Sequence, residues 1–208
     1  MQYFVLPTCC IAFNAKVASS ALACSIVKKF YPEKLQKTLD DHNATWSKFS
    51  QEFKDSLPES FQKMFKTDYA ESKNFWQTVC KRTFKPKLPI LLAVREPITR
   101  FASTVAYLNL GVEQSINALE NGDEVVVDKL PMVLAKNTHF LPQHICNTEG
   151  TKCYKFPEQL EQMCKDAGLD WPLPKINEGK NAKPVLTSEQ MERVKKFYAE
   201  DVKLYESL

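Results

Sequence analysis

Three short apolar runs, each followed by a polar loop and an amphipathic segment, divide the chain. The first, MQYFVLPTCCIAFN at positions 1–14, predicts a first buried strand, and a helix follows from about Ser20 to Tyr31. The second, from Leu88 to Val94, is apolar without interruption, which is typical of a strand buried on both faces. The third, TKCYKF at positions 151–156, predicts another short strand.

Helical patterns fill the intervals between these runs. Residues 33–84 are polar with aromatic residues three and four apart, and residues 98–110 predict a helix directly after the second strand. Residues 111–140 predict a helix, a turn at 121–123 and a second helix, and helices also follow at 157–169 and 187–208. This order predicts an α/β fold, a parallel sheet flanked by helices in a single domain spanning 1–208.

Composition narrows the classes of function. The 208 residues are 44% hydrophobic, enough for one core, and the formal net charge of +3 argues against a nucleic-acid partner. No apolar run reaches the roughly 18 residues of a membrane span, and no signal peptide precedes the first strand, so we expect a cytoplasmic protein. The seven cysteines include no CxxC pair, and only Cys146 and Cys153 are close enough to suggest a local disulfide.

The loop AKVASSA, between the first strand and its helix, has the composition of an anion site. Ligands settle at the carboxyl ends of parallel strands, where a helix N-terminus offers free N–H groups. A Walker loop needs glycines that are absent here, which disfavours ordinary ATP or GTP chemistry. Small residues still permit close approach of the backbone, and Lys16 adds a charge, so the loop suits a phosphate or phosphosulfate without a metal.

A second anion site is predicted at the end of the next strand. Arg95 precedes Ser103 by eight residues, so two helical turns bring a guanidinium and a hydroxyl toward one further phosphate. Two such strand ends in one sheet imply a ligand with two separated phosphate groups.

These two stretches resemble known motifs. NAKVASSAL is similar to the 5′-phosphosulfate loop, and VREPITRFAST to the 3′-phosphate motif, of sulfotransferases that use 3′-phosphoadenosine 5′-phosphosulfate (PAPS), especially the carbohydrate branch. THFLPQHIC, KCYKFPEQLEQMCKDAGL, LPKIN and FYAEDVKLY resemble that branch in order and spacing. The resemblance covers most of the chain except about 33–84.

The resemblance implies a P-loop-like sulfotransferase fold and a metal-independent enzyme that moves a sulfuryl group from PAPS to an acceptor hydroxyl, probably on a carbohydrate or glycan. Arg95 and Ser103 would hold the 3′-phosphate. Lys16 would stabilise the departing bridging oxygen, assisted by Ser19 or Ser20. The 5′-phosphosulfate would lie against Lys16 and the backbone of the loop residues Val17, Ala18, Ser19, Ser20 and Ala21.

The catalytic base is not fixed by the motifs. Family members place a His or Glu about twenty residues before the 3′-phosphate arginine, which falls near Glu71, or soon after the first helix, where His42 lies. His139 belongs to the recognisable HFLPQ stretch. We favour His139 and keep His42 and Glu71 open.

Several further residues have a structural and a functional interpretation. Glu96 and Pro97 are expected to end the strand and begin the helix, whereas Arg100 is either a packing ion-pair partner or a support for the cofactor site. Lys180 and Lys183 lie in a basic loop, NEGKNAKP, of the kind that closes over the cofactor in family members.

Two alternatives remain at the level of sequence. One is a small nucleotide or metabolite kinase with a degenerate loop, which would need a magnesium site that no motif supplies. The other is a non-catalytic module that binds 3′-phosphoadenosine 5′-phosphate (PAP) without chemistry. Relatives in the animal secretory pathway usually carry a membrane anchor and stem before the first strand, so a chain that begins near that strand favours a naturally soluble bacterial or viral type of enzyme over a trimmed catalytic domain.

Overall fold

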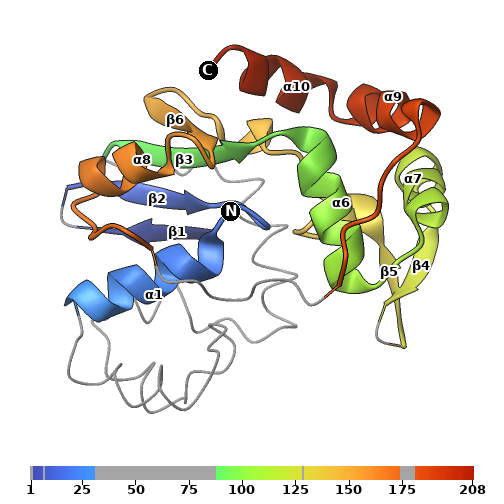
Figure 1. Cartoon of the computed structure of the whole chain (residues 1–208), viewed down its shortest axis with the longest axis horizontal. Coiled ribbons are helices and arrows are strands. Elements are labelled where there is room, and N and C mark those ends of the chain that lie inside the picture. The colour runs from blue at the N-terminus through green and yellow to red at the C-terminus, as the bar shows by residue number, and fades with distance from the viewer. Residues whose placement is uncertain (1, 7, 31–87, 128, 174–180) are drawn as a thin grey trace.

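The centre of the molecule is a four-stranded sheet with helices on both faces (Figure 1). A computed structural model describes residues 2–6, 8–30, 88–127, 129–173 and 181–208. The strand order is β1-β2-β3-β6, with β1 at Gln2–Val5, β2 at Cys10–Phe13, β3 at Ile90–Arg95 and β6 at Thr151–Phe156. Strands β2, β3 and β6 are parallel, which confirms the predicted α/β class with a parallel sheet.

The prediction of one strand over residues 1–14 is wrong. The segment forms two strands, because β1 pairs antiparallel with β2. The amide of Leu6 donates to the Cys9 carbonyl at 2.8 Å to close the turn. The sequence contains a proline at position 7, and a residue without an N–H is poorly suited to the interior of a continuous strand.

Each parallel strand leads into a helix. Helix α1 (Ser19–Phe30) follows β2, α6 (Pro97–Leu108) follows β3, and α8 (Leu160–Asp166) follows β6, starting three residues later than predicted. Successive residues of β3 are buried in two different cores, one on each face of the sheet. Leu91 packs in the core that includes α1 and α8, whereas Leu92 packs in the core that α10 (Ala199–Glu206) covers. This two-sided burial explains the uninterrupted apolar run.

The second helix predicted within residues 111–140 is absent from the structure. Helix α7 (Val112–Asn121) ends at Gly122, where φ is 77°, and two antiparallel strands follow, β4 at Glu124–Val127 and β5 at Leu130–Val133. In β4, Val125 and Val127 are buried and their neighbours exposed, which is the period of a strand. Two 3₁₀ turns, η2 (Leu134–Lys136) and η3 (His144–Cys146), then lead toward β6.

The C-terminal segment contains two helices where one was predicted. Helix α9 (Ser188–Phe197) begins with the expected capping box, in which Thr187 and Gln190 satisfy one another's amides. The chain then breaks at Tyr198, where φ is −102° and ψ is 32°, before α10 begins. The Tyr198 hydroxyl donates to the Phe140 carbonyl at 2.7 Å, so a tertiary contact fixes the break. None of the helices that the structure describes is long and apolar enough to cross a membrane.

Candidate functional site

The loop between β2 and α1 has an unusual backbone for residues that carry side chains. Lys16 and Ala18 both adopt positive φ, 65° and 50°, on either side of Val17, which is buried in the core. Alternation of left- and right-handed residues is the form in which successive N–H groups make a concave anion-binding nest. The loop therefore holds two residues other than glycine at positive φ, a conformation that occurs in such nests.

Arg95, the last residue of β3, reaches across to this loop. Its Nη1 donates to the Lys16 carbonyl at 2.9 Å and its Nε to Thr99 Oγ1 at 3.4 Å, while the guanidinium lies 5.5 Å from the centre of the Phe156 ring. Ser103 is half-buried two turns along α6, and no hydrogen bond among the described residues joins it to Arg95. The structure thus brings together the two predicted strand ends but shows no contact between Arg95 and Ser103.

Positive charge gathers at this edge of the sheet. The pKa of Lys16 is lowered to about 8, first by burial and then by the positive charges of Arg95 and Lys183. Asn181 holds the segment that carries Lys183, because its side-chain amide donates to the Ala106 carbonyl at 2.9 Å. Arg95 and Lys183 are thus near enough to lower the pKa of Lys16, and such a concentration of positive charge favours an anion.

Glu96 and Pro97 have the structural roles expected of them. The Glu96 carboxylate accepts hydrogen bonds from the amides of Ile98 at 2.9 Å and Thr99 at 2.7 Å, which makes it the N-cap of α6, and Pro97 is the first residue of that helix. Two of the free amides in the first turn of α6 are therefore hydrogen-bonded to the Glu96 carboxylate.

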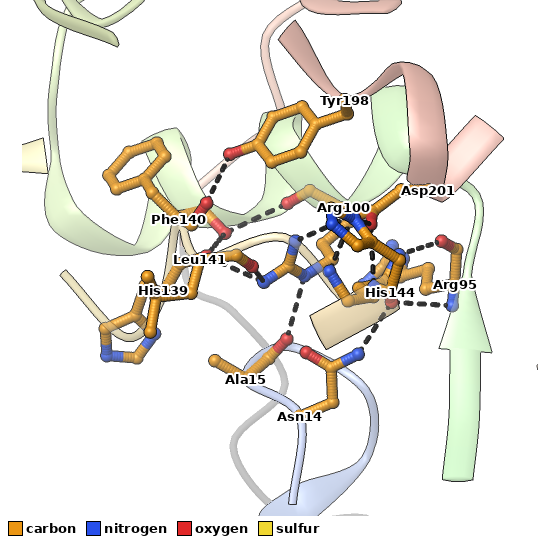
Figure 2. Close-up of polar contacts among 12 residues, drawn as sticks. Asn14, Ala15, Arg95, Arg100, His139, Phe140, Leu141, His144, Tyr198 and Asp201 are labelled. Atoms are coloured by element: carbon orange, nitrogen blue, oxygen red, sulfur yellow. Dashed lines mark hydrogen bonds and ion pairs between the residues drawn. The ribbon is translucent and has the colours of Figure 1, made fainter. Parts of the chain in front are cut away.

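Arg100 is buried and has the packing role, which is one of the two roles that the sequence allows for it. It is 2% exposed, and its guanidinium donates to the carbonyls of Ala15 at 3.3 Å, Leu141 at 2.7 Å and His139 at 3.3 Å (Figure 2). Nη1 lies 3.9 Å from Oδ2 of Asp201, which is fully buried. One side chain thus ties the loop between β2 and α1, the 139–141 segment and α10 together.

Gln143 and Asp201 extend this network. Gln143 is fully buried; its side chain accepts from the Arg95 amide at 2.9 Å and from Asn14 Nδ2 at 2.8 Å, and it donates to the Arg95 carbonyl at 2.7 Å. Asp201 accepts from the amides of Gln143 at 2.7 Å and His144 at 2.8 Å, and it pairs with Nδ1 of His144 at 2.8 Å. The ends of β2 and β3 are therefore joined by one amide side chain.

His139 lies near Lys16, separated from it by one aromatic ring. The Lys16 ammonium is 3.8 Å from the centre of the Tyr107 ring, and the rings of Tyr107 and His139 are 5.2 Å apart between centroids. In Figure 2 the imidazole points away from the Arg100 cluster, and its buried Nδ1 makes no hydrogen bond with the described residues. Burial, then the charges of Lys16 and Arg100, lower the pKa of His139 to about 4, so the ring is neutral at pH 7.

A pocket of about 530 Å³ opens beside these residues. It lies between the end of α6 and the β4–β5 hairpin, and its polar lining consists of Tyr107, Asn109, Asn137 and His139. Leu108, Val127, Leu130 and Met132 supply the apolar part.

Some candidates lie outside the described residues. These are His42, Glu71 and Lys180, together with the side chain of Ser20; the structure describes Ser19 and Ala21 at the start of α1. Cys146 and Cys153 are not joined by a disulfide, and Cys153 Sγ instead donates to Asn147 Oδ1 at 3.5 Å.

Sequence reasoning did not single out Tyr107, Gln143 or Asp201. Gln143 and Asp201 belong to the stretches THFLPQHIC and FYAEDVKLY, so the resemblance drew attention to their segments but not to their side chains. Tyr107 follows Ser103 by one helical turn in an ordinary amphipathic pattern, and nothing in the sequence distinguishes it. Comparisons of the chain with protein-family models, curated protein sequences and solved structures found no match.

Proposed function

We propose that the chain is a PAPS-dependent sulfotransferase that acts on the hydroxyl of a carbohydrate acceptor. The observation that carries the proposal is the meeting of Lys16, Arg95 and Lys183 at the joined ends of two parallel strands, beside a loop that holds two residues at positive φ. A ligand with two separated anionic groups would offset the positive charge that lowers the pKa of Lys16. PAPS has such groups, a 5′-phosphosulfate and a 3′-phosphate.

The proposed roles follow from position. The 5′-phosphosulfate would lie against Lys16 and the backbone of residues 17–21, and Arg95 would hold the 3′-phosphate together with Ser103. Arg95 donates from Nη1 to the Lys16 carbonyl and from Nε to Thr99 Oγ1. Its Nη2 makes no hydrogen bond with the described residues, so this nitrogen could donate to the ligand.

The transfer step is a displacement at sulfur. The acceptor oxygen forms a new bond to sulfur, and the bond from sulfur to the bridging oxygen breaks with its electron pair leaving on PAP. Lys16 would stabilise the negative charge that develops on that oxygen, and the acceptor proton would pass to a base.

His139 is the base that we propose. It is neutral at pH 7, lines the pocket and lies one ring away from Lys16. A pKa of about 4 makes it a weak base in the empty site. Because one cause of that low pKa is the charge of Lys16, an anion bound at Lys16 would strengthen the base when the cofactor is in place.

Calorimetric titration of PAP into the protein in EDTA, beside adenosine 5′-monophosphate, tests the proposal. We expect PAP to bind at least tenfold more tightly than the monophosphate, and the Arg95→Ala variant to lose this preference. Since Arg95 also holds the loop, Arg95→Lys provides a milder variant, and thermal unfolding reports whether each variant is folded. Arg193→Ala is the matched control, because Arg193 pairs with Glu113 and Glu120 on the surface of α9 and α7.

Equal binding of the two nucleotides, or binding unaffected in both Arg95 variants, would overturn the proposal. Binding that appears only with Mg²⁺ would favour the kinase alternative.

A further inference from the structure

Among the residues that the structure describes, none that lines the pocket beside His139 carries a full charge. Of the eight lining residues that the structure describes, four are apolar and the others offer two side-chain amides, a phenol and an imidazole that is neutral at pH 7. Bringing a carboxylate or sulfate into such a site would remove its hydration without supplying a cation in return. The walls therefore favour an uncharged ligand that has both polar and apolar surface.

The pocket is next to the reacting end of the proposed cofactor site. Tyr107 lines the pocket and also contacts the Lys16 ammonium, 3.8 Å from its ring centre, and the neighbouring His139 lines the same pocket. Tyr107 is 54% exposed, so its ring offers a face to a ligand. A molecule in this pocket would have its nearest hydroxyl beside the His139 imidazole and close to the Tyr107 ring that contacts the Lys16 ammonium.

We propose that this pocket receives the sulfuryl acceptor, and that the acceptor is a neutral glycoside whose ring packs on Tyr107. This inference rests on the proposed function and adds to it the charge of the substrate and the residue that selects it. Leu130 and Met132 of β5 contact the apolar part of the glycoside, and Asn109 is the amide available to its other hydroxyls. The Asn137 amide is already engaged, because its Oδ1 accepts from the His139 amide at 2.8 Å.

The test uses protein saturated with PAP, so that the cations at the strand ends are already neutralised. Phenyl β-D-glucopyranoside and its anionic counterpart, phenyl β-D-glucuronide, are titrated separately by calorimetry. We expect the glucoside to bind at least tenfold more tightly than the glucuronide. Tyr107→Ala should weaken binding of the glucoside about fivefold to tenfold, whereas Tyr107→Phe should retain it, because the stacking face remains.

A charge introduced into the pocket provides a sharper test. Leu130 lines the pocket and is 58% exposed, so Leu130→Lys should be tolerated and should improve glucuronide binding relative to glucoside by about tenfold. Val126, on the adjoining strand, is 65% exposed and does not line the pocket, so Val126→Lys is the matched control and should change neither affinity.

The outcomes separate the two proposals. If PAP binds as proposed but the two glycosides bind alike, or Leu130→Lys and Val126→Lys behave alike, the acceptor pocket is wrong and the cofactor assignment stands. If PAP itself does not bind, both fall. Glucoside binding that persists in Tyr107→Ala at full strength would exclude Tyr107 as the selecting residue and overturn the inference.

Discussion

Occupation of the cofactor site should raise the pKa of His139. In the empty site burial is the largest cause of the low value of about 4, and the positive charges of Lys16 and Arg100 follow. PAP would place phosphate oxygens against Lys16, so the field of that ammonium at the imidazole would be largely cancelled. Protonation of His139 then becomes easier, and its pKa rises.

The size of the effect follows from the geometry. The Lys16 ammonium is 3.8 Å from the Tyr107 ring centre, and that centre is 5.2 Å from the His139 ring centre, so the charge is at most about 9 Å from the imidazole. At an effective dielectric constant of about 20, two unit charges at about 9 Å interact by roughly 2 kcal/mol, equivalent to slightly more than one pH unit. We therefore expect PAP to raise the pKa of His139 from about 4 to about 5 or slightly above.

The assay is a pH titration of the imidazole Cε1–H resonance by NMR, with and without saturating PAP, assigned from the spectrum of His139→Gln. Lys16→Met is the informative control. Without that ammonium, the pKa of His139 should be higher in the empty site, and any binding of PAP should change it less. A His139 pKa that is unchanged or falls on addition of PAP to the wild-type protein would refute the electrostatic coupling and remove the reason to regard His139 as a base that the cofactor strengthens.

Three further predictions concern stability. The pKa of His139 is about 4 in the folded protein and ordinarily about 6.5, so the unfolded chain binds the extra proton as the pH falls. The free energy of unfolding should therefore decrease by roughly 3 kcal/mol between pH 6.5 and pH 4. Urea unfolding should show a shallower decrease for His139→Leu, and parallel curves for the two proteins would contradict this. Glu96→Ala should cost about 1 kcal/mol by removing the N-cap of α6, measured as a lower urea midpoint, and an unchanged midpoint would mean that the cap is dispensable. Asp201→Ala should lower the free energy of unfolding by about 3 kcal/mol or more, because it leaves the buried Arg100 without its carboxylate. Asp201→Asn should lower it by less. Equal small decreases in the two variants would argue against the buried pair.

The sequence pattern predicts the strands correctly where the local pattern and the packing of the core agree. The apolar run of β3 and the segment TKCYKF of β6 were found, because both are strands of the central sheet with strong apolar or β-branched character. The meeting of the AKVASSA loop with Arg95 was also foreseen, since parallel strands bring their carboxyl ends to one edge.

It was insufficient where tertiary contacts decide the outcome. The pattern of residues 124–133 predicts a helix, because the flanking segments have helical periodicity and the hairpin has no Asn-Gly turn. The alternation at Val125 and Val127 is a local sign of a strand in this segment. The break at Tyr198 depends on a hydrogen bond to Phe140, 58 positions away, which no local pattern encodes. Tyr107 matters only because the fold carries it to Lys16.

The absence of glycine from the loop between β2 and α1 is explained by the residues that surround it. Positive φ at Lys16 and Ala18 costs roughly 1 kcal/mol or more at each residue, a strain that glycine would avoid. Two arginines from the next strand and helix offset it, because Arg95 donates to the Lys16 carbonyl and Arg100 to that of Ala15. The loop shape therefore depends on β3 and α6 rather than on its own sequence. A ligand that binds Arg95 would act on the loop through the same side chain, so the two halves of the proposed anion site should be occupied together.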